Sequence, residues 1–180
     1  VYTILIRDMN SKIIFWMNDD LSGLGLPKIL QEKYNFDIFG VFDITDKPKK
    51  FFKKQKLINF SKIWFFHDHI NKTNLKPDRE FLKLIEEKYK VDLGLLVSNE
   101  RFFNKFNNFY KFSPDEILLI LEQECKLFEK ILDEVKPDFL IMGITTLHHN
   151  HLFYKICKAR GVKILMIRES YLRNRWLIAS

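Results

Sequence analysis

The chain has 180 residues, of which 47% are hydrophobic and 29% charged, and this composition is typical of one globular domain. Only 6 glycines and 5 prolines occur, which excludes collagen-like and low-complexity chains, and the plentiful apolar residues exclude a disordered one. The net charge is +7, and 18 residues are phenylalanine. Two cysteines, Cys125 and Cys157, without any C-x-x-C pattern exclude a disulfide framework and a zinc ribbon, and favour a reducing, cytoplasmic compartment.

The first part of the chain alternates predicted strands and helices. Residues 12–17 (K-I-I-F-W-M) are a short run rich in β-branched and aromatic side chains, which predicts a buried strand. Helical spacing of apolar residues predicts a helix over about 24–33, with Pro27 in its first turn, where proline is tolerated. A second strand is predicted at 36–42. Residues 47–56 form a lysine-rich connection that we expect to be partly helical.

The middle of the chain has weaker signals. A third strand is predicted at 63–66, and Pro77 and Asp78 open a helix that ends near residue 88. The short apolar run 95–97 predicts a fourth strand. The spacing of six aromatic side chains over 101–112 favours one face of a helix over a strand.

The clearest helix start in the sequence lies at residues 113–116. Ser113 offers an N-cap hydroxyl, Pro114 occupies the first helical position, and Glu116 occupies the third. This pattern is a capping box, and its acidic residues also interact favourably with the positive end of the helix dipole. We expect the helix to continue to Val135, where Pro137 blocks its extension.

The last third returns to the same alternation. A buried strand is predicted at 139–142, a helix at 147–160 that ends before Gly161, and a strong strand at 163–167. A basic tail follows, with a short apolar piece at 176–179. The longest stretch without an acidic or basic residue is shorter than the roughly 20 residues of a membrane span, so no transmembrane helix is expected.

Together these elements predict an α/β fold. Short apolar strands that alternate with helices are typical of a mostly parallel sheet covered on both faces. We therefore expect a doubly wound, three-layer α/β/α domain of the Rossmann or flavodoxin kind, with about five parallel strands.

Polar side chains follow the predicted strands, and ligands of doubly wound sheets bind at the carboxyl ends of the strands. All five histidines lie just beyond two of these strand ends, at positions 67, 69, 148, 149 and 151. A histidine can act as a general base, ligate a metal or donate to phosphate. We take His148 and His149 as candidate bases, with His67 and Asp68 as further catalytic candidates.

Three interpretations of the histidines stay open: a role in a substrate crevice, a metal site, and a purely structural role for polar side chains near helix starts. No zincin motif occurs, and a helix places residues 148 and 151, but not 149, on one face. We therefore expect no metal ligands and favour the substrate crevice.

The loop between the first strand and the first helix is where a nucleotide-binding fold places its phosphate loop. Here Ser22-Gly23-Leu24-Gly25 does not complete G-x-G-x-x-G, because the third glycine position holds Lys28, and no P-loop occurs. A classical NAD or ATP site is disfavoured. The loop is either a tight connection or a place where ligand approaches the backbone. The candidate substrate-binding residues at all strand ends are Asp19, Asp20, Gly23, Gly25, Thr145, Thr146, Arg168 and Arg173.

Two basic segments carry part of the positive charge. Residues 47–56 hold six lysines around Phe51 and Phe52, a pattern suited to an anionic membrane surface, or to a plainly solvated loop. Arg168 and Arg173 suit phosphate contacts, or are simply surface charge. No nucleic-acid-binding motif occurs, so we expect no nucleic acid partner.

Several segments of the chain carry a family resemblance. They are I-L-D-E-V-K-P-D-F-L-I at 131–141, the Thr/His-rich turn after it, L-F-Y-K-I-C-K-A-R-G-V-K-I at 152–164, the R-E-S and R-N-R-W-L-I pieces within 168–178, and D-L-S-G-L-G-L-P at 20–27. About half of the chain resembles the N-terminal Rossmann-like domain of GT-B glycosyltransferases, in particular those of capsule or surface polysaccharide biosynthesis.

The resemblance implies a function. The domain would bind a sugar or lipid-linked acceptor, hold no cofactor itself, and leave the nucleotide-sugar donor to a second, C-terminal domain. The loop at Gly23–Gly25 and the turn at Thr145–His149 would face the cleft between the domains, and a histidine there would act as base without a metal. Since the chain starts at Val1 instead of Met, we expect residues 1–180 to be the acceptor-side half of a longer protein, not active alone. The expected location is cytoplasmic and peripheral at the inner face of the membrane.

Two other functions remain as alternatives: a ligand-binding or interaction module without turnover, and a sugar-nucleotide epimerase-like fragment.

Overall fold

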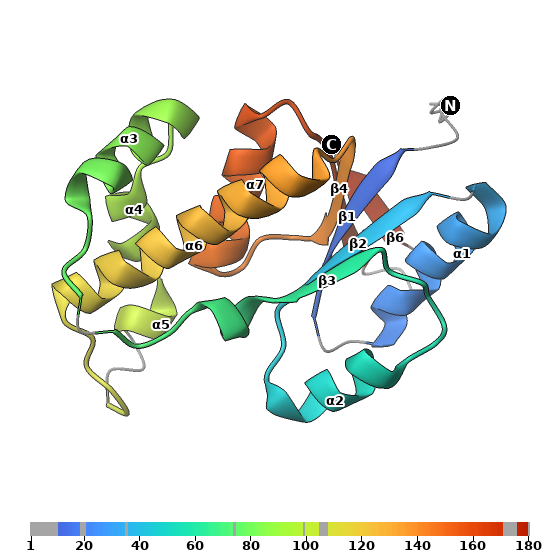
Figure 1. Ribbon diagram of the computed structural model, residues 1–180, viewed down its shortest axis with the longest axis horizontal. Helices are drawn as coiled ribbons and strands as arrows, with labels where there is room; N and C mark the ends of the chain where they lie inside the picture. Colours follow the sequence, from blue (N-terminus) through green and yellow to red (C-terminus); the bar gives the residue numbers. More distant parts are fainter. Residues whose placement is uncertain are drawn as a thin grey trace.

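The computed structural model describes residues 11–18, 21–34, 36–73, 75–98, 100–104, 108–170 and 176–179. Its centre is a six-stranded sheet in the order β3-β2-β1-β4-β5-β6, with helices on both faces (Figure 1). The first five strands are parallel, and β6 pairs antiparallel with β5 at the edge. The strands are β1 (Lys12–Met17), β2 (Asp37–Phe42), β3 (Lys62–Phe65), β4 (Phe139–Gly143), β5 (Lys163–Glu169) and β6 (Trp176–Ala179).

This order confirms the predicted doubly wound, three-layer fold. The chain moves outward from β1 to β3 and then crosses back to place β4 on the other side of β1. That order is Rossmann-like, because a flavodoxin-like sheet would place β3 on the far side of β1 from β2. The switch point between β1 and β4 is where ligands of such sheets bind.

The two faces of β1 show why the sheet is buried on both sides. Ile14 and Trp16 contribute to one hydrophobic core, while Ile13, Phe15 and Met17 contribute to the other. Successive side chains of a strand point to opposite faces, so an uninterrupted apolar run is stable only between two layers of helices.

The helices divide between these two cores. The larger core involves α3 (Arg79–Tyr89), α4 (Leu93–Ser98), α6 (Pro114–Val135) and α7 (His148–Ala159). The short α5 (Arg101–Asn104) lies near the N-terminal end of α6 (Figure 1). The smaller core involves α1 (Gly25–Tyr34) and α2 (Asp46–Lys54). Two 3-10 turns complete the described elements, η1 (Leu21–Leu24) and η2 (Phe66–His69).

The capping box predicted at residues 113–116 is present. The Ser113 hydroxyl accepts a hydrogen bond from the Glu116 backbone N–H at 3.2 Å, and a Glu116 carboxylate oxygen accepts from the Ser113 N–H at 2.8 Å. At the other end, Lys136 adopts the left-handed conformation with φ of 51° and stops the helix before Pro137.

Two predictions about local structure were wrong, and one segment without a prediction forms a strand. Residues 95–97 belong to helix α4, because an apolar run this short suits a buried helix as well as a strand, and the Asp92 carboxylate accepts the Leu95 N–H at 2.7 Å at the helix start. Of the helix predicted over 101–112, residues 101–104 are helical as α5, whereas the described residues 108–112 are not. The apolar piece at 176–179 pairs with β5 as a strand.

Within the described part of the chain, no helix combines the length and the apolar character that crossing a bilayer requires.

Candidate functional site

A cavity of about 550 Å³ lies where the carboxyl ends of β2 and β3 meet the N-terminus of α7. One wall is the segment after β3, another is α6, and further lining side chains come from α5 and from the described residues just before α6. Most of its lining is apolar, and its aromatic members are Phe66, Phe102, Phe103, Tyr110 and Phe112. A pocket of this size, largely apolar with a few convergent polar groups, is typical of small-ligand sites.

One carboxylate joins two histidines in this cavity. Asp43, which directly follows β2, lies 3.0 Å from His67 Nε2 through one oxygen and 2.7 Å from His149 Nε2 through the other. Burial by itself would raise the pKa of Asp43, but the hydrogen bonds from His149 and His67 outweigh it and hold that pKa well below its usual value. Asp43 is therefore ionised at neutral pH, and both Nε2–H groups donate to it.

His149 packs against two aromatic rings that also contact each other. Its imidazole stacks on the Phe66 ring with centroids 4.6 Å apart, and the centroid of the Trp16 ring lies 5.8 Å from that of the imidazole. Because its ring is buried and bonded to Asp43, it has one fixed orientation.

His148 lies between two buried glutamates. Its Nδ1 is 2.8 Å from a Glu100 oxygen, and its Nε2 is 3.0 Å from a Glu124 oxygen. Burial would lower the pKa of His148, but the hydrogen bonds and charges of Glu124 and Glu100 outweigh it, so the pKa of His148 is raised.

Glu100 is positioned by two helix starts. Its carboxylate accepts the backbone N–H of Phe102 at 2.9 Å and that of His148 at 2.7 Å, at the first turns of α5 and α7. Burial opposes ionisation, yet these bonds and the His148 ring lower the pKa of Glu100. Glu100 thereby links the start of α5 to the start of α7.

The structure brings together three of the four predicted catalytic residues. His148, His149 and His67 line the cavity. Asp68 does not join them, because its carboxylate forms an ion pair with Lys49 and is about half exposed. Among the remaining histidines, His151 bonds Thr145 at 3.1 Å, and burial and Lys155 lower its pKa.

The predicted substrate-binding residues lie elsewhere. Gly23 and Gly25 are at the start of α1, and a Cβ on Gly23 would come within 3.2 Å of the Met17 side chain, which supports a tight strand–helix connection there. Of the described members of this set, none lines the cavity, including the exposed Thr146 and Arg168. Asp19, Asp20 and Arg173 lie outside the described residues.

The carboxylates Asp43, Glu100 and Glu124 were missed as site residues. A signal existed for Glu124, because it falls on the apolar face of α6, between Leu121 and Phe128, where helical spacing predicts only hydrophobic side chains. A charged residue at a core position is nearly always paired or ligating.

Fold and cavity define a Rossmann-like α/β protein with a buried histidine–carboxylate cluster at the carboxyl edge of its sheet. No family model matches the chain, and no curated protein matches its sequence.

Proposed function

We propose that this chain is the acceptor-binding domain of a glycosyltransferase-like protein in surface polysaccharide or glycoconjugate synthesis, and that its cavity takes the acceptor. The observation that carries the proposal is the His67–Asp43 pair in the wall of the aromatic cavity. The family resemblance of the sequence supplies the reaction class, and the pair supplies the group that such a reaction needs.

His67 has the properties of a general base for an acceptor hydroxyl. Its side chain is 48% exposed, and its Nε2–H donates to the ionised Asp43. This bond fixes the tautomer in which Nδ1 carries the lone pair, as a carboxylate fixes the histidine base of catalytic triads, with the roles of the two ring nitrogens exchanged. As the hydroxyl attacks, Nδ1 takes its proton, and the Asp43 carboxylate stabilises the imidazolium that forms.

This proposal assigns the base to His67 in preference to His148 and His149. Both nitrogens of His148 already bond glutamates, and the His149 ring is enclosed by aromatic side chains. Their place is in the cavity wall, where they hold Asp43 and Glu100 in position.

The cavity suits a sugar with an apolar attachment. Its aromatic rings offer flat apolar faces, while carboxylates and imidazoles provide acceptors and donors for hydroxyl groups. In this proposal the nucleotide-sugar donor binds to a separate domain, and the nucleoside diphosphate leaves as the acceptor oxygen bonds the sugar.

A role at a membrane surface is part of the proposal. On α2, Phe52 is buried in the core while Phe51 is 46% exposed beside the exposed Lys47, Lys50 and Lys54. Positions 47, 50, 51 and 54 share one helix face, which presents lysines and an aromatic ring to an anionic bilayer.

The test compares His67→Gln with His69→Gln, a histidine two residues away that does not line the cavity. Binding of alkyl and aryl glycosides to the chain is measured by saturation-transfer NMR. Transfer is measured as nucleoside diphosphate release by the protein that contains this chain. We expect His67→Gln to keep glycoside binding and to lower kcat by about 100-fold or more, and His69→Gln to leave both unchanged.

Two results would count against this function. If no glycoside binds the wild-type chain, the cavity is not an acceptor site. If glycosides bind but His67→Gln leaves turnover intact, the domain is a binding module, and the base lies elsewhere.

A further inference from the structure

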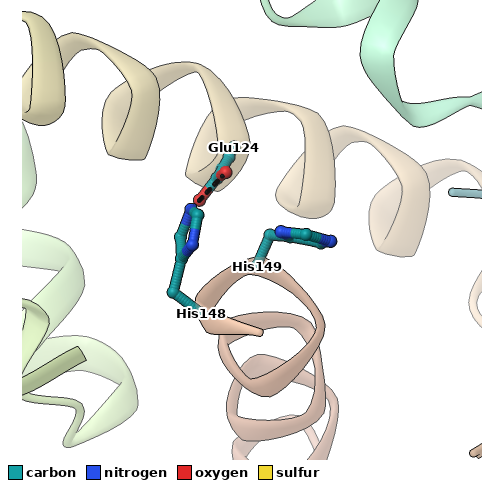
Figure 2. A group of neighbouring side chains, drawn as sticks. All are labelled: Glu124, His148 and His149. Atoms are coloured by element: carbon teal, nitrogen blue, oxygen red, sulfur yellow. Dashed lines mark hydrogen bonds and ion pairs between the residues drawn. The ribbon is translucent and has the colours of Figure 1, made fainter. Parts of the chain in front are cut away.

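Three side chains in the cavity wall have a geometry that the proposed acceptor chemistry does not use. Glu124 reaches down from α6 toward His148 and His149, which are consecutive residues at the start of α7 (Figure 2). One ligand atom from each lies within 4.8 Å of the others. Both histidine rings are buried, and their centroids are 5.1 Å apart at nearly a right angle.

The outer nitrogen of each histidine is bonded to a different carboxylate. His148 Nδ1 bonds Glu100, and His149 Nε2 bonds Asp43. The other two nitrogens, His148 Nε2, which bonds Glu124, and His149 Nδ1, lie on the side of Glu124 (Figure 2). Metal-ligating histidines show this pattern in proteins: the far nitrogen donates to a carboxylate, which fixes the tautomer and directs the lone pair at the metal.

A second observation points to a missing ligand. Glu124 is 1% exposed, and its Oε2 has no hydrogen-bond partner among the described residues, although it belongs to the cavity wall. A buried carboxylate oxygen without a partner is costly, and native proteins satisfy almost all such atoms. A cation at this oxygen would satisfy it.

The charges around the cluster also favour a cation. Asp43, Glu100 and Glu124 converge on the two rings. Within the described part of the lining, Lys72 is the one lysine or arginine, and it is bonded to Tyr110 and Glu116 instead. Within the described lining, no lysine or arginine therefore pairs with these three carboxylates.

From these observations we propose that Glu124, His148 and His149 form a binding site for a divalent transition-metal ion, with zinc as the expected occupant. Two histidines and a glutamate are the ligand set of catalytic zinc sites that keep a fourth position open, and here all three side chains line the cavity. A tetrahedral zinc ion with bonds of about 2.1 Å places its ligand atoms roughly 3.4 Å apart, so the three side chains close in slightly on binding. The proton between His148 Nε2 and Glu124 leaves to solvent when the metal binds.

The same ligand set occurs in mononuclear iron(II) sites, so the experiment has two metal arms. The chain is stripped with chelator and titrated with zinc(II), and under argon with iron(II), by competition with a colorimetric chelator. We expect one zinc per chain, weaker iron(II) binding, and no binding of magnesium(II), which prefers oxygen ligands. Cobalt(II) in place of zinc should give the visible absorption bands of a tetrahedral site.

Substitutions of a proposed ligand, of a ligand's hydrogen-bond partner and of control residues test where the metal binds. Glu124→Gln should abolish stoichiometric zinc binding and the zinc-dependent rise in melting temperature. Asp43→Asn, which removes the carboxylate partner of His149 and also that of His67, should weaken zinc binding by about 10- to 100-fold. The matched controls Asp68→Asn and His69→Gln should bind zinc like the wild type.

The proposal is overturned if the stripped wild-type chain takes up no zinc at one equivalent, or if Glu124→Gln binds zinc with unchanged affinity. Equal loss in His69→Gln would assign the uptake to the surface. The wild-type cobalt spectrum needs no variant, so it decides the question even if Glu124→Gln does not fold. This site departs from the sequence-based expectation of no metal, and none of its tests depends on glycosyl transfer.

Discussion

Asp43 and Asp68 are aspartates at the same edge of the sheet with different surroundings. The Asp43 side chain is 12% exposed and bonds two imidazoles, whereas that of Asp68 is 46% exposed and pairs with Lys49. Hydrogen bonds to a buried charge contribute more to stability than exposed ion pairs, which solvent screens.

We therefore expect Asp43→Asn to lower the free energy of unfolding by about 1–3 kcal/mol and Asp68→Asn to lower it by less than about 1 kcal/mol. Urea unfolding of the metal-free chain, followed by circular dichroism, measures both. Equal effects of the two substitutions would contradict the buried bridge between His67 and His149.

The histidines of the site and the position of Asp43 directly after a strand could be predicted from the sequence, whereas the positions of Glu100 and Glu124 could not. A cluster of histidines after predicted strands is visible in any sequence of this class. Glu100 follows a segment that was predicted as a strand and is the helix α4, so its position at the start of α5 was not foreseen. Glu124 lies in the middle of a long helix, far from any strand end.

At the scale of elements, α6 depends on its capping box. The Ser113 hydroxyl satisfies an N–H of the first turn that has no partner within the helix. Ser113→Ala should cost about 1 kcal/mol of stability, measured by urea unfolding at neutral pH. No change would mean that water replaces the hydroxyl at this helix end.

The stability that this capping box contributes depends on pH. The Ser113 backbone N–H, and then the Tyr110 hydroxyl, bond the Glu116 carboxylate and lower its pKa from 4.5 to about 2. A carboxyl group whose pKa is lowered by folding stabilises the protein above its unfolded pKa, and this contribution is lost as pH falls through the folded value. Between about pH 5 and pH 2, Glu116→Gln should therefore lose less stability than the wild type. Parallel pH curves for the two proteins would contradict this.

Helix α2 provides a prediction about membranes. Lys50→Glu combined with Lys54→Glu should abolish sedimentation of the chain with anionic phosphatidylglycerol vesicles, because attraction to such a surface is about 1 kcal/mol per basic residue. Lys76→Glu with Lys83→Glu makes the same change in net charge at exposed positions outside α2 and should retain binding. Equal loss in both pairs would indicate that net charge alone is responsible.

For the whole molecule, stability depends on strands that are covered on both faces. Leu140 in β4 is fully buried, whereas Leu177 in the edge strand β6 is 57% exposed. Leu140→Ala should cost about 2–5 kcal/mol and lower the melting temperature by about 2–4 °C per kcal/mol. Leu177→Ala should change stability by less than about 0.5 kcal/mol. Scanning calorimetry compares the two, and a small effect at Leu140 would show that β4 is not central to the core.

The sequence by itself determined the alternation of strands and helices, the start and end of α6, and the doubly wound class, because these follow from patterns within a few neighbouring residues. Only the tertiary structure decided which polar groups meet. His148 bonds residues 24 and 48 positions away, and His149 bonds a residue 106 positions away. Such contacts arise when α6, in the crossover from β3 to β4, packs against α7, in the crossover from β4 to β5, and local patterns carry no information about that packing. The hydrogen bonds between the buried carboxylates and the histidines are therefore determined by the folded chain.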